Sequence, residues 1–193
     1  MIIENQHQIA AISTFIITGL LSIFVLAKGA RRPVTLLFGI YTIAISAWSF
    51  CWYKMISSPV HAHSLFWARF LHVPASFSPA TFLHFVQCLL NIQEDRRQVF
   101  LRRMFYGFGT LFPVLCFLNS FSADVVAKLG FQYYLEPGPY YVSFLIFFIV
   151  AIVSIDYLLF TAYKKTIGSK KTQIAYVLPA YVLGYAGGAG PRE

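Results

Sequence analysis

The candidates for chemistry in this sequence are four ionisable side chains that lie inside long apolar blocks, Arg69, His72, His84 and Asp156. Ionisable groups are costly in the hydrocarbon layer of a membrane, so they face a protein interior or a wet cavity and are candidates for function. Two of the four are imidazoles, which exchange protons near neutral pH. These residue types indicate recognition of a polar or charged ligand, or proton sensing, rather than covalent catalysis.

The block at 65–90 carries most of this chemistry on one face. At about 100° per residue in a helix, five polar side chains fall within an arc of roughly 120°. They are Arg69, His72, Ser76, His84 and Gln87. Two interpretations stay open: a ligand-sensing or proton-sensing face, or a face that hydrogen-bonds neighbouring helices with Arg69 and Gln87 near the two membrane surfaces.

Asp156 is the only acidic residue well inside an expected membrane helix. It falls in the inner part of the block at 140–163, and an intramembrane carboxylate is a functional candidate when it has a partner. We expect that partner to be His84 or Gln87, which lie toward the same side. The alternative is a structural carboxylate that reaches the interface or bonds to Tyr157 and Tyr163.

Signatures of catalysis and of cofactor or metal binding are missing from the sequence. There is no G-x-S-x-G, no H-E-x-x-H and no phosphate-binding glycine loop. His61 and His63 flank Ala62, but a metal site needs three or more ligands. The cysteines lie in apolar blocks without a C-x-x-C partner and are expected to be packing residues: Cys51, Cys88 and Cys116. We therefore expect no catalytic residue, no cofactor, no metal and no enzymatic activity.

Composition indicates the elements that carry these residues. The chain has 193 residues, of which 58% are hydrophobic and 11% charged, whereas soluble domains have roughly 25% charged residues. Blocks near the roughly 20 residues of a membrane-crossing helix recur at 9–27, 34–56, 65–90, 104–121, 140–163 and 174–188. They are too long and too continuously apolar for barrel strands. The predicted fold is an all-α polytopic membrane bundle, in one domain spanning residues 1–193.

Basic residues set the expected orientation. The loops after the first, third and fifth blocks hold three, four and four Lys or Arg residues, which is eleven of the chain's fifteen. Because Lys and Arg favour cytoplasmic loops, these loops are placed in the cytoplasm and the N-terminus outside. The net charge of +8 resides in such clusters, so nucleic-acid binding is not expected. Glu4 stands where a signal peptide would be basic, so the first block is expected to be retained.

The sixth block is short. Residues 174–188 would form a helix of about 22 Å, whereas the hydrocarbon layer is roughly 30 Å thick. Ala180, Gly184 and Gly188 recur every four residues, a spacing that favours close helix contact. We therefore expect five full spans and a partial sixth, with the chain truncated at its C-terminus.

Small and hydroxyl residues also follow one face of each of the first two blocks, and they favour close helix–helix packing. These residues are Ala11, Thr14, Thr18 and Ser22 in the first block, and Thr35, Thr42, Ser46, Ser49 and Tyr53 in the second.

Three motifs in this order, on this topology, carry a family resemblance. They are Trp67-Ala68-Arg69-Phe70 with Pro74 and Pro79-Ala80-Thr81-Phe82, then Glu136-Pro137-Gly138-Pro139-Tyr140-Tyr141, then Lys171-Thr172-Gln173-Ile174-Ala175-Tyr176 continuing to Gly184-Tyr185-Ala186-Gly187-Gly188. The chain resembles the N-terminal seven-transmembrane sensor region that precedes many bacterial histidine kinases. The family pattern would continue the sixth helix beyond Gly188 and add a seventh helix, and here the sequence departs from it.

The resemblance implies a sensory input module of a two-component histidine kinase in the bacterial inner membrane, without the kinase output domain in this chain. The implied partners are the lipid bilayer, an unknown small-molecule or membrane signal, and a second copy of the chain. Two alternatives stay open: a transporter or channel subunit, and a non-catalytic membrane assembly protein. A transporter would be expected to show internal repeats or charged pairs at the midplane, and the sequence shows neither.

Overall fold

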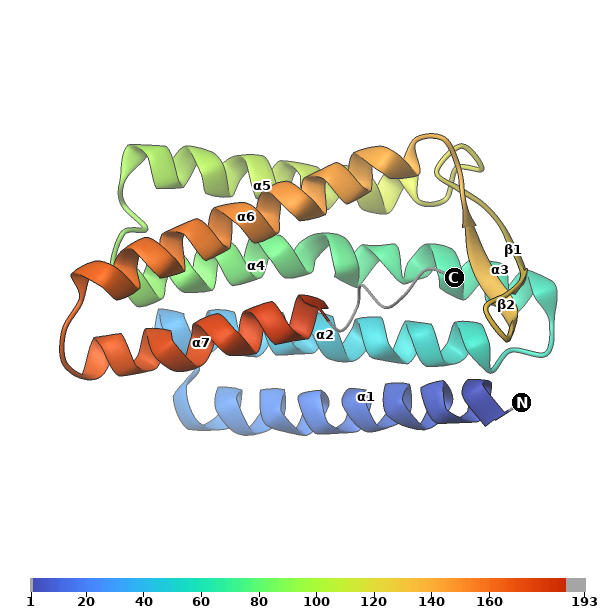
Figure 1. The fold of residues 1–193 in the computed structure, drawn as a ribbon, viewed down its shortest axis with the longest axis horizontal. Helices are drawn as coiled ribbons and strands as arrows, with labels where there is room; N and C mark the ends of the chain where they lie inside the picture. The colour runs from blue at the N-terminus through green and yellow to red at the C-terminus, as the bar shows by residue number, and fades with distance from the viewer. Residues whose placement is uncertain (1, 187–193) are drawn as a thin grey trace.

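The computed structural model describes residues 2–186, which form a bundle of helices joined to one β-hairpin. The elements in chain order are α1 (Ile2–Gly29), α2 (Pro33–Ile56), α3 (His61–Phe70), α4 (His72–Leu90), α5 (Arg96–Leu115), β1 (Ser122–Lys128), β2 (Phe131–Pro137), α6 (Tyr141–Lys165) and α7 (Ser169–Ala186). The long helices run side by side along one axis (Figure 1).

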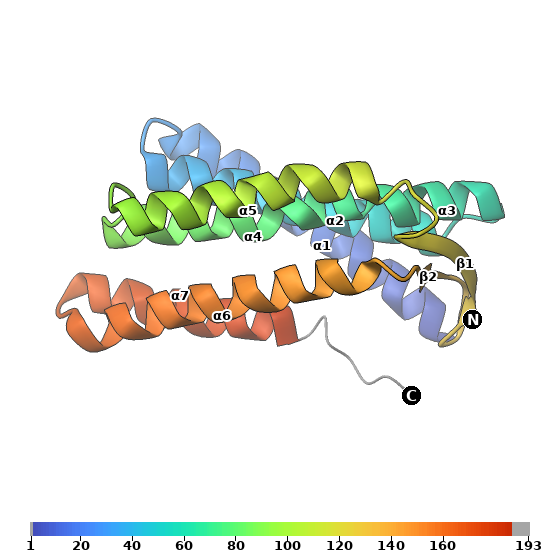
Figure 2. The ribbon, with the colours of Figure 1, turned by 90° about the horizontal axis from the view of Figure 1, so that it is seen from above.

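The two ends of the bundle differ in the turns that they gather. The α1–α2, α4–α5 and α6–α7 turns lie together at one end, the basic end, and the three basic clusters lie in these turns or in the helix ends that adjoin them (Figure 1). Helix α3 and the β1–β2 hairpin lie at the opposite end, the hairpin end (Figures 1 and 2). This gathering at one end of the bundle agrees with the predicted grouping of the basic loops, whereas their placement in the cytoplasm stays a prediction.

Helices α1 and α2 approach closely. A Cβ on Gly39 would meet the Leu26 side chain, which would have to shift, so glycine allows the close approach seen here. Ser22 Oγ donates to the Gly39 carbonyl at 3.0 Å, and Ser46 Oγ donates to the Phe15 carbonyl at 2.9 Å. The predicted packing face is thus confirmed for the two serines.

The threonines of α1 behave differently. The hydroxyl groups of Thr14 and Thr18 donate to carbonyls one turn earlier in their own helix, with Thr14 exposed and Thr18 partly buried. They therefore take no part in the hydrogen bonds across the α1–α2 interface.

Helices α3 and α4 form the centre of the bundle, with one interruption at Leu71. In their most apolar window, 72% of the residues are buried inside the protein, against 11% for α1. Pro74 has no N–H to donate to the Phe70 carbonyl one turn earlier, which explains why α3 ends at Phe70. Helix α4 then packs against α2, α5 and α6, so the polar residues of the predicted 65–90 helix point into protein.

Helix α5 occupies Arg96–Leu115 and not the expected 104–121. Asp95 caps its N-terminus by accepting the Arg97 N–H at 2.8 Å, so the helix begins before the arginines instead of after them. Arginine is also a good helix former, and its charge does not end a helix. Pro113 lies in the last turn, and the chain leaves the helix after Leu115.

The segment between α5 and α6, expected to be a loop, is an antiparallel hairpin. Leu129 and Gly130, at φ 55° and 79°, form the tight turn between β1 and β2, with the positive φ values of a type I′ turn. This is the point at which the structure departs from an all-α fold. Gly138 follows the hairpin, and a Cβ there would lie 2.3 Å from the Ser120 carbonyl oxygen.

Four helical segments in the described residues are long and apolar enough to cross a membrane: Asn5–Gly29, Pro33–Ile56, His61–Leu90 and Tyr141–Lys165. They match four of the expected blocks, and the observed boundaries extend furthest at the start of α1. Helix α7 begins at Ser169, five residues before the expected start at 174. The expected end of that helix at Gly188 lies outside the described residues.

Helix α7 contacts the central helix through one ring pair. Tyr181 and Phe82 stack with centroids 4.4 Å apart and planes inclined by 4°. Ile174 and Tyr181 are the buried side chains of α7 among those that the structure describes, and both belong to the main hydrophobic core.

Candidate functional site

Arg69 joins α3 to the segment that follows α5. Its Nη2 donates to Asn119 Oδ1 at 2.6 Å and to the Ser122 carbonyl at 3.1 Å. Among the side chains that the structure describes, no carboxylate forms an ion pair with this guanidinium, and its Nε is buried without a hydrogen-bond partner. The side chain therefore keeps an uncompensated charge and an unused donor.

His72 lies one turn further along, at the start of α4, and is only 1% exposed. Its Nδ1 lies 2.9 Å from the Ala68 carbonyl. Because a carbonyl oxygen only accepts, Nδ1 carries the proton, which leaves Nε2 of the neutral ring as an acceptor. In the described structure Nε2 has no hydrogen-bond partner.

Aromatic rings surround His72. Phe121, Tyr141 and Phe144 meet the imidazole edge-on, with centroids 5.4, 5.5 and 5.2 Å away. Phe121 precedes β1, and the other two belong to the first turn of α6. The imidazole is thus held between α4, α6 and the hairpin connection.

Ser122 completes this group. The residue is fully buried, and its Oγ has no hydrogen-bond partner among the described residues. We call Arg69, His72, Asn119 and Ser122 the polar centre. Buried polar atoms without partners cost about 1–3 kcal/mol each. The polar centre holds three such atoms, one donor on Arg69, one acceptor on His72 and one hydroxyl on Ser122, which together can pair with a small solute that both accepts and donates hydrogen bonds.

His84 and Gln87 face α5 instead of α6. His84 Nδ1 lies 3.2 Å from the Tyr106 hydroxyl. Gln87 is fully buried, and its Nε2 donates to the carbonyl and to Oε1 of Gln98 at 3.1 and 3.2 Å. Arg102 Nη1 donates to Gln87 Oε1 at 3.4 Å. These contacts clamp α4 to α5 at the basic end.

Asp156 does not form the expected pair. His84 and Gln87 are engaged by α5, and Asp156 Oδ1 is buried without a hydrogen-bond partner in the part of the chain that the structure describes. The prediction failed because it matched only the expected depths of the residues in the membrane. The pairing also depends on which neighbouring helix packs against the polar face of α4. That helix is α5.

The chain was compared with known protein families, and the family model for the N-terminal 7TM region of histidine kinase matches residues 10–189. The chain belongs to this family. Comparisons with curated proteins and with solved structures find no match. The match covers both ends of the bundle, from α1 to the last described turn of α7.

The candidate residues of this histidine-kinase 7TM region lie in three places. Arg69 and His72 meet at the polar centre, His84 lies between α4 and α5, and Asp156 lies on α6. Sequence reasoning missed Asn119 because it placed residues 104–121 in one helix, and it missed Ser122 because it placed that residue in the loop that follows. The signal was present, since Asn119 to Ser122 is a polar stretch that directly follows an apolar block.

Proposed function

We propose that this chain is the sensory input module of a bacterial two-component histidine kinase and detects a small polar or anionic signal at the polar centre. The observation that carries the proposal is the set of three buried, unpartnered polar atoms on Arg69, His72 and Ser122. They come from α3, α4 and β1. A solute that bonds to all three would draw these elements together.

The proposed placement is in the inner membrane, with the basic end in the cytoplasm and the N-terminus outside. The support is that all three basic clusters gather at one end (Figure 1), as expected when Lys and Arg stay in the cytoplasm. The polar centre then lies at the outer surface, where a signal can reach it.

We infer that α5 also crosses the membrane. The 20 residues of α5 give a length of about 30 Å, which matches the hydrocarbon layer. Its arginines lie in the first turns at the basic end, and one face of the helix exposes a continuous apolar stripe: Phe100, Met104, Phe108, Leu111 and Val114. Such a stripe fits contact with lipid.

The contacts of the polar centre also provide a route for signal transfer along the bundle. His72 lies at the hairpin end of α4, and the rings of Tyr141 and Phe144 lie at the hairpin end of α6. Both helices continue to the basic end (Figure 1). A shift of about 1–2 Å between packed helices is the usual scale of such transitions, and here it would reach the cytoplasmic side without catalysis in this region.

A thermal-shift screen of the purified full chain against small polar and anionic solutes tests the proposal. We expect at least one solute to raise the Tm of the wild type, and Arg69→Gln to abolish that rise. Arg103→Gln is the matched control, because Arg103 is an exposed arginine of α5. If the two variants respond alike, or if no solute acts on the wild type, the polar centre is not the sensing site.

A further inference from the structure

A hollow of about 210 Å³ opens at the basic end, where α4 and α6 end and α7 begins. Its lining includes two lysines, two threonines and two leucines: Lys165, Lys170, Thr161, Thr166, Leu158 and Leu90. The hollow therefore offers cations and hydroxyl donors together with an apolar wall.

The two lysines carry charge that the protein does not neutralise. In the described residues, neither Lys165 nor Lys170 forms an ion pair with a carboxylate. Lys165 is exposed, whereas Lys170 Nζ donates to the Leu90 carbonyl at 3.2 Å. This hydrogen bond fixes one ammonium group between α7 and the end of α4, so the position of the charge is set by the fold.

An apolar track leads from the hollow along α6 toward the middle of the bilayer. Tyr157, which lines the hollow, is 69% exposed and begins this track. Further exposed apolar side chains follow at helical spacing: Val153, Val150, Ile149 and Ile146. The acyl chain of a lipid can pack along such a surface, whereas a free phosphate ion would gain nothing from contact with apolar side chains.

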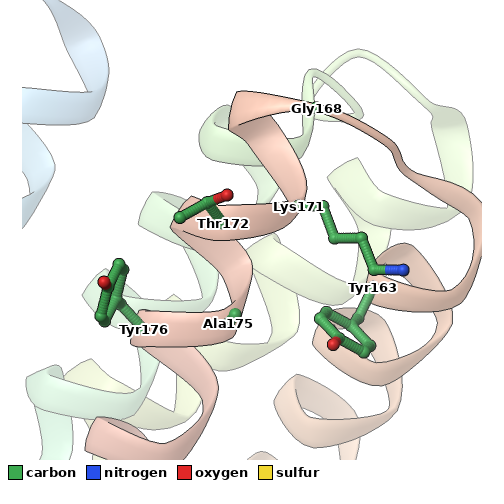
Figure 3. A pocket seen from close by; sticks show the side chains of 6 residues that line it. All are labelled: Tyr163, Gly168, Lys171, Thr172, Ala175 and Tyr176. Carbon is green, nitrogen blue, oxygen red and sulfur yellow. The ribbon is translucent and has the colours of Figure 1, made fainter.

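The other side of the α6–α7 turn provides a contrast. A more open hollow there is lined by Tyr163, Lys171, Thr172 and Tyr176 (Figure 3). Lys171 reaches over the Tyr163 ring, with its Nζ 4.9 Å from the centroid. Lys164 Nζ lies 4.3 Å from the centroid of Phe160. These two lysines thus face aromatic rings, at the same turn as Lys165 and Lys170.

We propose that the hollow between α4, α6 and α7 binds the phosphate group of an anionic phospholipid, with Lys165 and Lys170 as its cationic ligands. The volume fits a headgroup and excludes the acyl chains, which lie outside along α6. Basic pockets between membrane helices at the cytoplasmic side are a recognised type of lipid-headgroup site. The bound lipid would connect three helices and restrict the movement of α7 against α4. The inference does not depend on which signal the polar centre detects.

Native mass spectrometry of the full chain in detergent tests the inference, with dioleoylphosphatidylglycerol, dioleoylphosphatidylcholine and inorganic phosphate as separate titrants. We expect tight binding of one phosphatidylglycerol and much weaker binding of the other two. The double substitution Lys165→Gln with Lys170→Gln should weaken phosphatidylglycerol binding about tenfold or more. The matched control, Lys164→Gln with Lys171→Gln, removes the same charge from the same turn and should weaken binding no more than about twofold to threefold.

Three results would overturn the inference. Equal losses in the two double variants would mean diffuse attraction of lipid to a basic surface. Inorganic phosphate that binds as tightly as the lipid would mean an anion site without lipid. The third result combines two variants. The Lys165→Arg with Lys170→Arg variant loses binding and shows an altered gel-filtration profile, while the single Lys165→Gln variant, which keeps the hydrogen bond from Lys170 to Leu90, binds like the wild type. This outcome would mean that Lys170 acts only through its bond to Leu90.

Discussion

The two ends of the bundle hold their helices together through different kinds of contact. The hairpin end closes over aromatic rings, with Phe121, Tyr141 and Phe144 against His72. The basic end is joined by polar contacts instead, through Gln87 with Arg102 and through Lys170 with the Leu90 carbonyl. The hairpin end therefore gathers three unpartnered polar atoms in one group, the polar centre, while the basic end leaves cations exposed.

The difference separates two kinds of recognition. A buried site with few, unpartnered polar atoms selects its solute by hydrogen bonding, because each atom left unmatched costs free energy. An exposed cationic site attracts any anionic surface, and its strength falls with salt. The hairpin end thus suits a specific signal, and the basic end suits the membrane itself.

Accessibility labelling gives the largest expected contrast between the ends. In intact cells, a membrane-impermeant maleimide should label the Lys128→Cys variant in the hairpin and leave the Ser169→Cys variant in the α6–α7 turn unlabelled until the membrane is permeabilised. Both positions are exposed, and the three native cysteines are buried, so the wild type is the background control. Labelling of both variants in intact cells would contradict the proposed orientation.

Removal of one ring should destabilise the hairpin end strongly. Phe121 is 1% exposed and packs against His72, Phe112 and Phe144. We expect Phe121→Ala to cost about 3 kcal/mol of unfolding free energy, measured by denaturant unfolding in detergent. Phe117→Ala is the matched control, because Phe117 is 43% exposed, and it should cost under about 1 kcal/mol. Similar costs for the two variants would show that the ring cluster does not hold this end together.

Substitutions of two buried serines should distinguish a hydroxyl group that stabilises the fold from one that is available to bind a ligand. Ser64 Oγ donates to the Met55 carbonyl at 2.9 Å, whereas Ser122 Oγ has no partner in the described structure, and both residues are fully buried. Ser64→Ala should cost about 1 kcal/mol and Ser122→Ala close to zero, measured by the same unfolding assay. A comparable loss in Ser122→Ala would indicate that its hydroxyl serves the fold, and would weaken the case for a ligand at the polar centre.

The sequence predicted the membrane helices well because their signal is local. Continuous apolar blocks located α2 and α6 to within two residues at each end. The start of α5 was missed because arginines were taken to mark a loop, whereas Asp95 caps a helix that contains them. The hairpin was missed because short strands of mixed polarity, joined at Leu129 and Gly130, carry little signal in a chain dominated by long helices.

The candidate site was predicted only in part, for the same reason. Arg69 and His72 were located from their own helix, but their neighbours come from distant segments. Asn119 and Ser122 are 50 and 53 residues from Arg69 in the sequence. The periodicity of one helix predicts the direction in which a side chain points, but it does not predict which residues of other segments that side chain contacts. The expected pairing of Asp156 with His84 or Gln87 failed on that distinction.

The stacked pair of Tyr181 and Phe82 has a mechanical consequence for α7. Rings that lie flat on each other, as these do with a 4° inclination, keep most of their contact when one slips along the other, whereas rings locked edge-on around His72 do not. At this point α7 is therefore restrained against tilting away from α4 but meets little resistance to sliding lengthwise. The lengthwise position of α7 is therefore set by its other contacts, namely the hydrogen bond from Lys170 to the Leu90 carbonyl and the buried side chain of Ile174.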